Sequence, residues 1–220
     1  MKFSIFQVNI NSYDKPFPAN TTGNAILFTD KHKNVSGWNE KIISSDKNPF
    51  NTVFDIRWHP FKYTNDDYVI WTDGSIEVKK DPKKWIDLMK NTNSDFAIIK
   101  HPYRTNIYDE YVEWVKIRNY DKLKAFSWLS YMTENGWNPK QDGLYQSTIM
   151  IFKNCDKVKE FCNSLWKILH TFDKENVERL DQTIASYLIK TKFQDMKVLE
   201  LPKEIMNCNE FSLHWNHPMR

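Results

Sequence analysis

The stretch of residues 68–76 constrains the fold most strongly, because an apolar run (Tyr-Val-Ile-Trp-Thr) is followed at once by Asp73-Gly74. A short apolar run bounded by turn residues is typical of a strand buried in a sheet. Asp73 would then lie at the carboxyl end of that strand, where open α/β sheets bind their ligands. An Asp-Gly pair also favours a hairpin turn, and locally the two interpretations are equally good.

Strand-like apolar runs alternate with helical patterns along the rest of the chain. Strands are expected at residues 3–10, 24–29, 52–58, 68–72, 96–100, 145–152 and 196–199. Helices are expected after an N-cap at Asp81, over residues 108–133 with 119–121 as a candidate interruption, and over residues 156–169 and 178–190. This alternation predicts a three-layer α/β/α sandwich around a mostly parallel sheet. No linker or repeat divides the 220 residues, so we expect one domain over residues 1–220, alone or as a module of a larger protein.

No glycine-rich phosphate loop follows any of these strands, because the five glycines fit neither a Walker loop nor a G-x-G-x-x-G turn. This excludes most dehydrogenases and P-loop enzymes. A nucleotide bound by such a chain would have to be held by acids, a metal ion and aromatic side chains.

Composition excludes several other classes. The net charge of +3 comes from scattered lysines and not from a basic stripe, so no nucleic-acid partner is expected. Three cysteines suit neither a disulfide framework nor a zinc site. No segment approaches the roughly 18 apolar residues of a membrane span, and no signal sequence is recognisable. We therefore expect a cytoplasmic protein without a transmembrane segment.

Asp73 and Arg57 are the first candidates for chemistry. Carboxylate oxygens bind Mg²⁺ or Mn²⁺, and such a cation bridges phosphate oxygens. Arg57 belongs to the expected strand 52–58, whose alternation places it on the same side as Asp55 and His59. Its planar guanidinium suits a diphosphate or a carboxylate. A salt bridge at the strand end is the commoner outcome for a single arginine.

Two further pairs follow later in the chain. His101 and Arg104 come after the expected strand 96–100, on a loop that Pro102 stiffens, and such strand ends collect ligand contacts. Asp181-Gln182 falls near the start of the expected last helix. An acid and an amide there could accept a proton and bond a sugar hydroxyl, although helix capping alone would also explain them.

The chain ends on two histidines, His214 and His217. A neutral imidazole is a good metal ligand, and a late histidine could complete a site begun by Asp73. This requires that the C-terminal segment lie close to Asp73.

The order and spacing of these motifs resemble the glycosyltransferase-like domain first described as a domain of unknown function, which includes plant proteins linked to mucilage and pollen. The resemblance extends over nearly the whole chain. The residues that carry it are 8–16 (VNINSYDKP), 28–30 (FTD), 57–61 (RWHPF), 71–76 (WTDGSI), 101–104 (HPYR), 108–110 (YDE), 143–145 (GLY), Phe161-Cys162 with Trp166, and Asp181-Gln182.

This resemblance implies a GT-A-type glycosyltransferase. It would take a nucleotide-diphosphate sugar, expected to be a UDP-sugar, and a glycan or glycoconjugate acceptor, and would use Mn²⁺ or Mg²⁺. The donor would be bound by Tyr13, Asp14, Arg57, Asp73, Ser75 and Arg104. The resemblance also implies Asp73 and His214 or His217 as metal ligands, and His101 and Gln182 as substrate contacts. Asp181 would be the catalytic carboxylate, and it would act as the base if the enzyme inverts.

The chain departs from the family pattern at two places. The glycines expected before Tyr13 are Ile10, Asn11 and Ser12, and the arginine expected before Asp181 is Leu180. The Asp-x-Asp motif usual in such enzymes has Ser75 in place of its second acid. Two other functions stay open: a metal-dependent hydrolase or nucleotidyltransferase acting on nucleotide sugars, and a carbohydrate-binding module whose aromatic residues stack on sugars.

Overall fold

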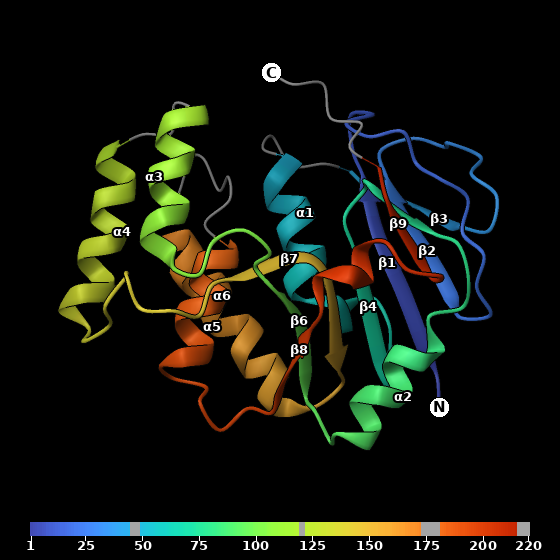
Figure 1. The fold of residues 1–220 in the computed structure, drawn as a ribbon. Coiled ribbons are helices and arrows are strands. Elements are labelled where there is room, and N and C mark those ends of the chain that lie inside the picture. Colours follow the sequence, from blue (N-terminus) through green and yellow to red (C-terminus); the bar gives the residue numbers. More distant parts are fainter. Residues whose placement is uncertain (45–48, 119–121, 173–180, 215–220) are drawn as a thin grey trace.

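A seven-stranded sheet forms the centre of the computed structural model, which describes residues 1–44, 49–118, 122–172 and 181–214. The strand order is β3-β2-β1-β4-β7-β6-β8 (Figure 1). Neighbouring strands are parallel except at β7, which is antiparallel to both β4 and β6. The strands are β1 (Phe3–Asn9), β2 (Asn24–Thr29), β3 (Asn39–Ile42), β4 (Tyr68–Thr72), β6 (Phe96–Lys100), β7 (Tyr145–Lys153) and β8 (Val198–Leu201).

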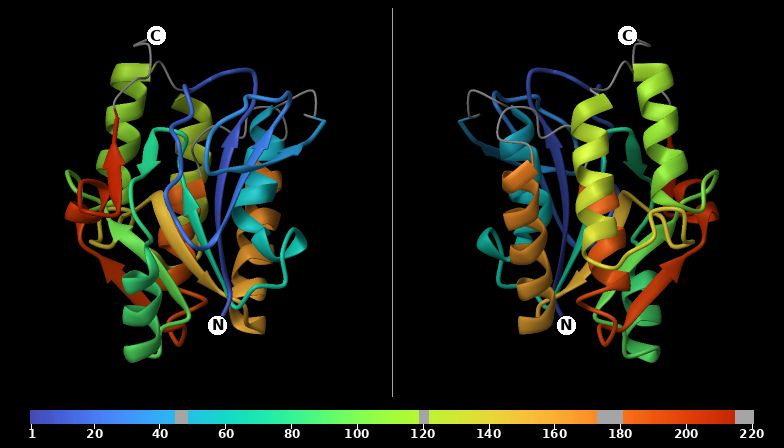
Figure 2. Two further views of the ribbon diagram at one scale, coloured as in Figure 1. Left: turned by 90° about the vertical axis from the view of Figure 1, so that its right-hand side faces the viewer. Right: turned by 90° about the vertical axis from the view of Figure 1, so that its left-hand side faces the viewer.

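Helices and a small second sheet cover the two faces of this sheet (Figure 2). The helices are α1 (Pro49–Trp58), α2 (Lys83–Asn91), α3 (Ile107–Arg118), α4 (Lys122–Glu134), α5 (Asp156–Phe172) and α6 (Asp181–Lys190), with 3-10 turns η1 (Pro60–Lys62) and η2 (Lys203–Met206). The second sheet pairs β5 (Ile76–Val78) with β9 (Phe211–Leu213).

Each face of the sheet has its own hydrophobic core, as the alternation of side chains along a strand requires. Phe6 and Val8 of β1 face the core formed with α1, α3, α4, α5 and α6. Ile5 faces the other core, formed with α2, η2 and the β5–β9 pair. The predicted three-layer α/β fold with a mostly parallel sheet is confirmed.

Residues 52–58 are not a strand, and this prediction is wrong. They belong to α1, in which Phe54, Ile56 and Trp58 are buried. Helix α1 packs against both β1 and α5, so more than one of its faces is apolar. Its buried residues therefore fall at every second position, which is the sequence pattern of a strand. The strand geometry expected for Arg57 therefore does not apply, and Arg57 lies on a different side of the helix from Asp55 and His59.

The remaining expected elements are present with small shifts. Six of the seven expected strands are β1, β2, β4, β6, β7 and β8, although β8 begins at Val198. The expected long helix is two helices, α3 and α4, on either side of residues 119–121. Helix α6 is described from Asp181 onward, so residues 178–180 of that expected helix lie outside the described part of the chain. No helix in the described ranges is long and apolar enough to cross a membrane.

Segments far apart in the sequence meet at the carboxyl ends of β1 and β4. Because β7 runs in the opposite direction, its first residues reach the same edge, and the Asp73 N–H donates to the carbonyl of Thr148 (2.9 Å). Helix α6 is fixed there too, since Ser186 Oγ accepts a hydrogen bond from the Tyr145 N–H (2.9 Å). This edge of the sheet is where the candidate site lies.

Candidate functional site

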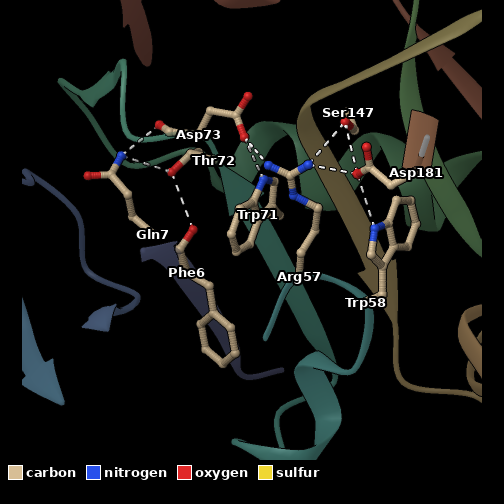
Figure 3. Close-up of polar contacts among 9 residues, drawn as sticks. All are labelled: Phe6, Gln7, Arg57, Trp58, Trp71, Thr72, Asp73, Ser147 and Asp181. Carbon is tan, nitrogen blue, oxygen red and sulfur yellow. Dashed lines mark hydrogen bonds and ion pairs between the residues drawn. The ribbon is translucent and has the colours of Figure 1, made fainter. Parts of the chain in front are cut away.

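The turn that follows β4 holds Asp73 in a fixed backbone conformation. The Ile76 N–H donates to the Asp73 carbonyl (2.9 Å). Buried Gln7 of β1 donates its side-chain amide to the carbonyl of Asp73 at 2.9 Å (Figure 3). The same amide donates to the carbonyl of Ile76, also at 2.9 Å. The strand after the turn, β5, pairs with β9 and not with β4, so Asp73-Gly74 is not a hairpin turn. The interpretation of Asp73 as a strand-end acid is the one the fold supports.

Arg57 lies between two aspartates. Its Nη2 is 2.6 Å from Asp73 Oδ1 and its Nη1 is 2.7 Å from Asp181 Oδ2 (Figure 3). The guanidinium carbon is 4.7 Å from the centre of the Trp71 ring, whose Nε1–H donates to Asp73 Oδ1 (3.1 Å). The exposed fraction is 11% for the Arg57 side chain, 33% for Asp73 and 4% for Asp181. Asp73 is therefore the most accessible member of this triad.

One carboxylate oxygen of Asp181, Oδ2, accepts hydrogen bonds from several donors. Besides Arg57, the Trp58 Nε1–H donates to Asp181 Oδ2 (3.2 Å), and the Ser147 hydroxyl is 3.5 Å from the same oxygen (Figure 3). These partners come from α1 and β7, whereas Asp181 opens α6. The Arg57–Asp181 pair joins positions 124 residues apart.

The triad has an excess of negative charge. Burial raises the pKa of Asp73, Arg57 and Trp71 oppose this increase, and the carboxylates of Asp181 and Asp14 add to it. A Cβ at Gly74 would collide with Asp14 Oδ2, so Asp14 lies directly against the Asp73 turn. Arg57 therefore faces two carboxylates, and a third, that of Asp14, lies beside the Asp73 turn. A diphosphate would be repelled from this edge unless a further cation accompanied it.

Tyr13 and Asp14 lie on the loop that leaves β1. The side-chain amide of buried Asn9 donates to the Asp14 carbonyl (2.7 Å) and ties the loop to the strand end. Asn11 and Ser12 have positive φ values of 56° and 53°. They therefore keep the left-handed backbone that glycines would adopt there, which asparagine tolerates better than most residues. Tyr13 is 46% exposed beside this loop.

A second polar cluster, the Glu110 cluster, consists of His101, Arg104, Glu110 and Gln182. Glu110 is 1% exposed and accepts hydrogen bonds from Arg104 Nε and, at 2.6 Å, from Gln182 Nε2. His101 Nε2 is 3.6 Å from Glu110 Oε2. Arg104 is therefore paired away from Arg57, and the two arginines expected to contact phosphate lie in different clusters. Because Gln182 follows Asp181, the first turn of α6 joins both clusters.

His101 is held as a neutral imidazole. Its Nδ1 accepts hydrogen bonds from the backbone N–H groups of Tyr103 (3.3 Å) and Arg104 (3.0 Å). Burial, with the charge of Arg104, lowers the pKa of His101 from 6.5 to about 4. The proton of the neutral ring is therefore on Nε2, facing Glu110.

The lowered pKa of His101 predicts a pH-dependent loss of stability. Because its folded pKa of about 4 lies below its ordinary 6.5, the unfolded chain binds the extra proton, and stability falls as pH decreases through this window. The loss by pH 4 is on the order of 3 kcal/mol. We expect His101→Gln to remove this slope, measured as unfolding free energy in urea between pH 4 and 8. Equal slopes for the two proteins would contradict a buried neutral His101.

The last strand brings His214 to the Asp73 turn. The His214 N–H donates to the Ser75 carbonyl (2.9 Å). The C-terminal segment therefore lies close to the Asp73 turn, as a metal-binding role for His214 requires. The imidazole, however, points to Glu77, with Nε2 2.9 Å from Glu77 Oε2, and stacks on Phe17 at 4.2 Å between ring centres. His217 lies outside the described residues.

The described residues supply only part of a metal site. No group of three or more His, Cys, Asp and Glu side chains among them is arranged to hold a metal ion. Ser75, where a second acid would stand, is 6% exposed. Mg²⁺, however, is often bound by one or two carboxylates together with phosphate and water oxygens. Asp73 and Asp14 fit a cation that arrives with a diphosphate.

Several residues of the site were not predicted. Trp58 and Trp71 donate indole N–H groups to the two aspartates, Gln7 holds the turn, and Ser147 approaches Asp181. The sequence could have indicated Trp71 as a neighbour of the site, because it lies two residues before Asp73 on the same strand. Glu110, which the sequence showed only as part of the 108–110 motif, is the centre of its cluster.

The protein is thus an α/β protein whose sheet carries acids and an arginine at the carboxyl ends of β1 and β4, and its sequence has no glycine-rich phosphate loop. The sequence model of the family described as "TOD1/MUCI70, glycosyltransferase-like domain" matches residues 53–164, about half of the chain, and the protein belongs to this family. The predicted resemblance to this family is confirmed over these residues. The matched range contains Arg57, Asp73 and Glu110, whereas Asp14 and Asp181 lie outside it. No curated protein matches the chain.

Proposed function

We propose that the protein is a glycosyltransferase that moves a sugar from a UDP-sugar to a glycan or glycoconjugate acceptor with the help of Mn²⁺ or Mg²⁺. The observation that carries the proposal is the Asp73–Arg57 pair at the carboxyl end of β4, inside the segment matched to a glycosyltransferase-like family. An accessible carboxylate beside a buried guanidinium suits a metal-bound diphosphate.

On the donor side, the cation would be held by Asp73 and Asp14 and would neutralise charge on the departing diphosphate. The bond from the anomeric carbon to the diphosphate oxygen breaks, a bond to the acceptor oxygen forms, and the proton of the acceptor hydroxyl passes to an oxygen of the released diphosphate. Arg57 adds a fixed positive charge at the same edge, which needs no reorganisation during the reaction. Tyr13 offers an exposed ring for stacking on the base.

On the acceptor side, the proposal assigns Gln182 and the Glu110 cluster. Glu110 fixes Gln182 through its side-chain amide, and Arg104 is 27% exposed at the same place. His101 supports this cluster through Glu110 and the backbone, and its neutral ring adds no charge there. His214 would complete the metal site by turning its ring from Glu77 toward Asp73, and His217, outside the described residues, is the alternative ligand.

Thermal stabilisation by UDP, GDP, ADP and CMP, each with and without Mn²⁺, tests the proposal first. At a hundred times its dissociation constant a ligand should add about 2.7 kcal/mol, a shift of roughly 5–11 °C for a domain of this size. We expect a shift for UDP that requires Mn²⁺, and no such shift for the other three nucleotides.

Product analysis then separates the related functions. A transferase releases a nucleoside diphosphate together with a glycoside, whereas a hydrolase or nucleotidyltransferase yields free sugar, a monophosphate or pyrophosphate. Glycan binding without any nucleotide or metal effect would instead establish a binding module and overturn the proposal.

A further inference from the structure

We propose that Asp181 is a positioning residue that acts through Arg57 on the donor diphosphate, and that it does not take the proton of the acceptor. This inference rests on the proposed transferase function. It assigns to Asp181 a different role from the one that the family resemblance implies, and it starts from the contacts of a single carboxylate oxygen.

Asp181 has little surface with which to meet an acceptor. Its side chain is 4% exposed, and Oδ2 is occupied by Arg57 Nη1 at 2.7 Å and by the Trp58 Nε1–H at 3.2 Å. A general base must come within hydrogen-bond reach of the hydroxyl that it deprotonates. Asp181 Oδ2 is turned into the protein, toward a cation that comes from α1.

Proton uptake by Asp181 would also remove a charge that the fold needs. Arg57 has only 11% of its side chain exposed, its Nε has no hydrogen-bond partner among the described residues, and its charge is compensated by Asp73 and Asp181. Neutralising one of two partners of a buried cation is strongly unfavourable. A base that loses an ion pair each time it accepts a proton is poorly suited to turnover.

The same contacts explain how Asp181 can act at a distance. Arg57 uses one terminal nitrogen for each aspartate, and two such bonds fix both the position and the plane of its guanidinium. The Trp71 ring lies 4.7 Å from the guanidinium carbon and supports that plane. Asp181 therefore sets where Arg57 presents its charge, and Arg57 in turn holds Asp73 at the proposed diphosphate site.

The two roles predict different effects on the binding of UDP, which contains no acceptor. If Asp181 positions Arg57, Asp181→Asn should weaken binding of UDP with Mn²⁺ about tenfold, equivalent to about 1.4 kcal/mol. If Asp181 is a base for the acceptor, UDP affinity should stay unchanged while kcat falls by a factor of about 10² to 10⁴. Isothermal titration with UDP and Mn²⁺, together with steady-state kinetics, distinguishes the two roles.

A double-mutant cycle with Arg57→Lys tests whether the effect passes through Arg57. Lysine keeps the charge but lacks the fork that reaches both aspartates. We expect Asp181→Asn to weaken UDP binding less than twofold in the Arg57→Lys background, because the positioned group is already lost. An undiminished tenfold effect there would overturn the proposal, since Asp181 would then act independently of Arg57.

Controls keep the test decisive. Asp195→Asn removes an exposed carboxylate that pairs with Lys157 at 2.6 Å, and it should leave UDP binding unchanged. If Asp181→Asn does not fold, Trp58→Phe removes only one donor to Asp181 and should weaken UDP binding two- to threefold; unchanged binding would contradict the proposal. If the wild-type protein binds no nucleotide with Mn²⁺, the proposed function itself is wrong. If the wild-type protein binds UDP and Asp181→Asn binds it equally well, only the positioning role of Asp181 is wrong.

Discussion

Replacing Asp73 by asparagine is expected to lower transfer activity by a factor of about 10² to 10³, the usual effect of removing one group that stabilises charge in a transition state. Asparagine has nearly the same shape and can still accept the hydrogen bond from the Trp71 Nε1–H. It lacks the negative charge that would hold the cation and that pairs with Arg57 at 2.6 Å. The defect should therefore be electrostatic, with the fold retained.

The measurement combines kcat/KM for a UDP-sugar with UDP-induced thermal shifts, with and without Mn²⁺. We expect Asp73→Asn to lose the part of the shift that depends on Mn²⁺, and we expect its own melting temperature to fall because Arg57 keeps only one of its two carboxylate partners. The matched control, Asp195→Asn, changes an exposed carboxylate remote from the site and should behave as wild type in both assays. Full activity and a normal Mn²⁺-dependent shift in Asp73→Asn would show that Asp73 is only a turn residue.

The sheet could be predicted from sequence where strands are buried on both faces. The run of residues 68–72 is apolar at nearly every position because β4 lies in the middle of the sheet, between β1 and β7. The edge strand β3 (Asn39–Ile42) has no such run and was not predicted. The direction of β7 could not be predicted either, since an apolar run carries no information on whether its neighbours are parallel.

The site was predictable residue by residue but not as an arrangement. Asp73 could be placed because it directly follows a strand, a local relation. Arg57 was expected near phosphate for the wrong reason, as part of a strand, and it reaches Asp73 from α1 instead. Its contact with Asp181 joins distant parts of the chain, and no local pattern encodes such a pair. The indole N–H groups of Trp58 and Trp71 were missed because a tryptophan in a sequence does not show which group its N–H will meet in the fold.

The largest effect on stability is expected from Arg57→Met. Methionine fills much of the same space, but it leaves Asp181, with 4% of its side chain exposed, without a cation. Breaking a buried ion pair in this way typically costs about 3–5 kcal/mol. For a domain of this size the melting temperature should fall by roughly 6–20 °C. Urea unfolding and calorimetry at pH 7 measure the loss.

Two further measurements show whether the stability loss of Arg57→Met comes from the unpaired carboxylate of Asp181 or from lost packing. Adding Asp181→Asn to Arg57→Met removes the stranded carboxylate and should restore more than half of the lost stability, because replacing a whole buried pair is far less costly than breaking it. The deficit of Arg57→Met should also shrink as pH falls from about 7 to 5, since a carboxylate without its cation binds a proton more readily in the folded state. If packing were the cause, the second substitution would destabilise further and the deficit would not vary with pH. The two outcomes have opposite signs, so the energetic role of Arg57 can be decided without any assay of transfer.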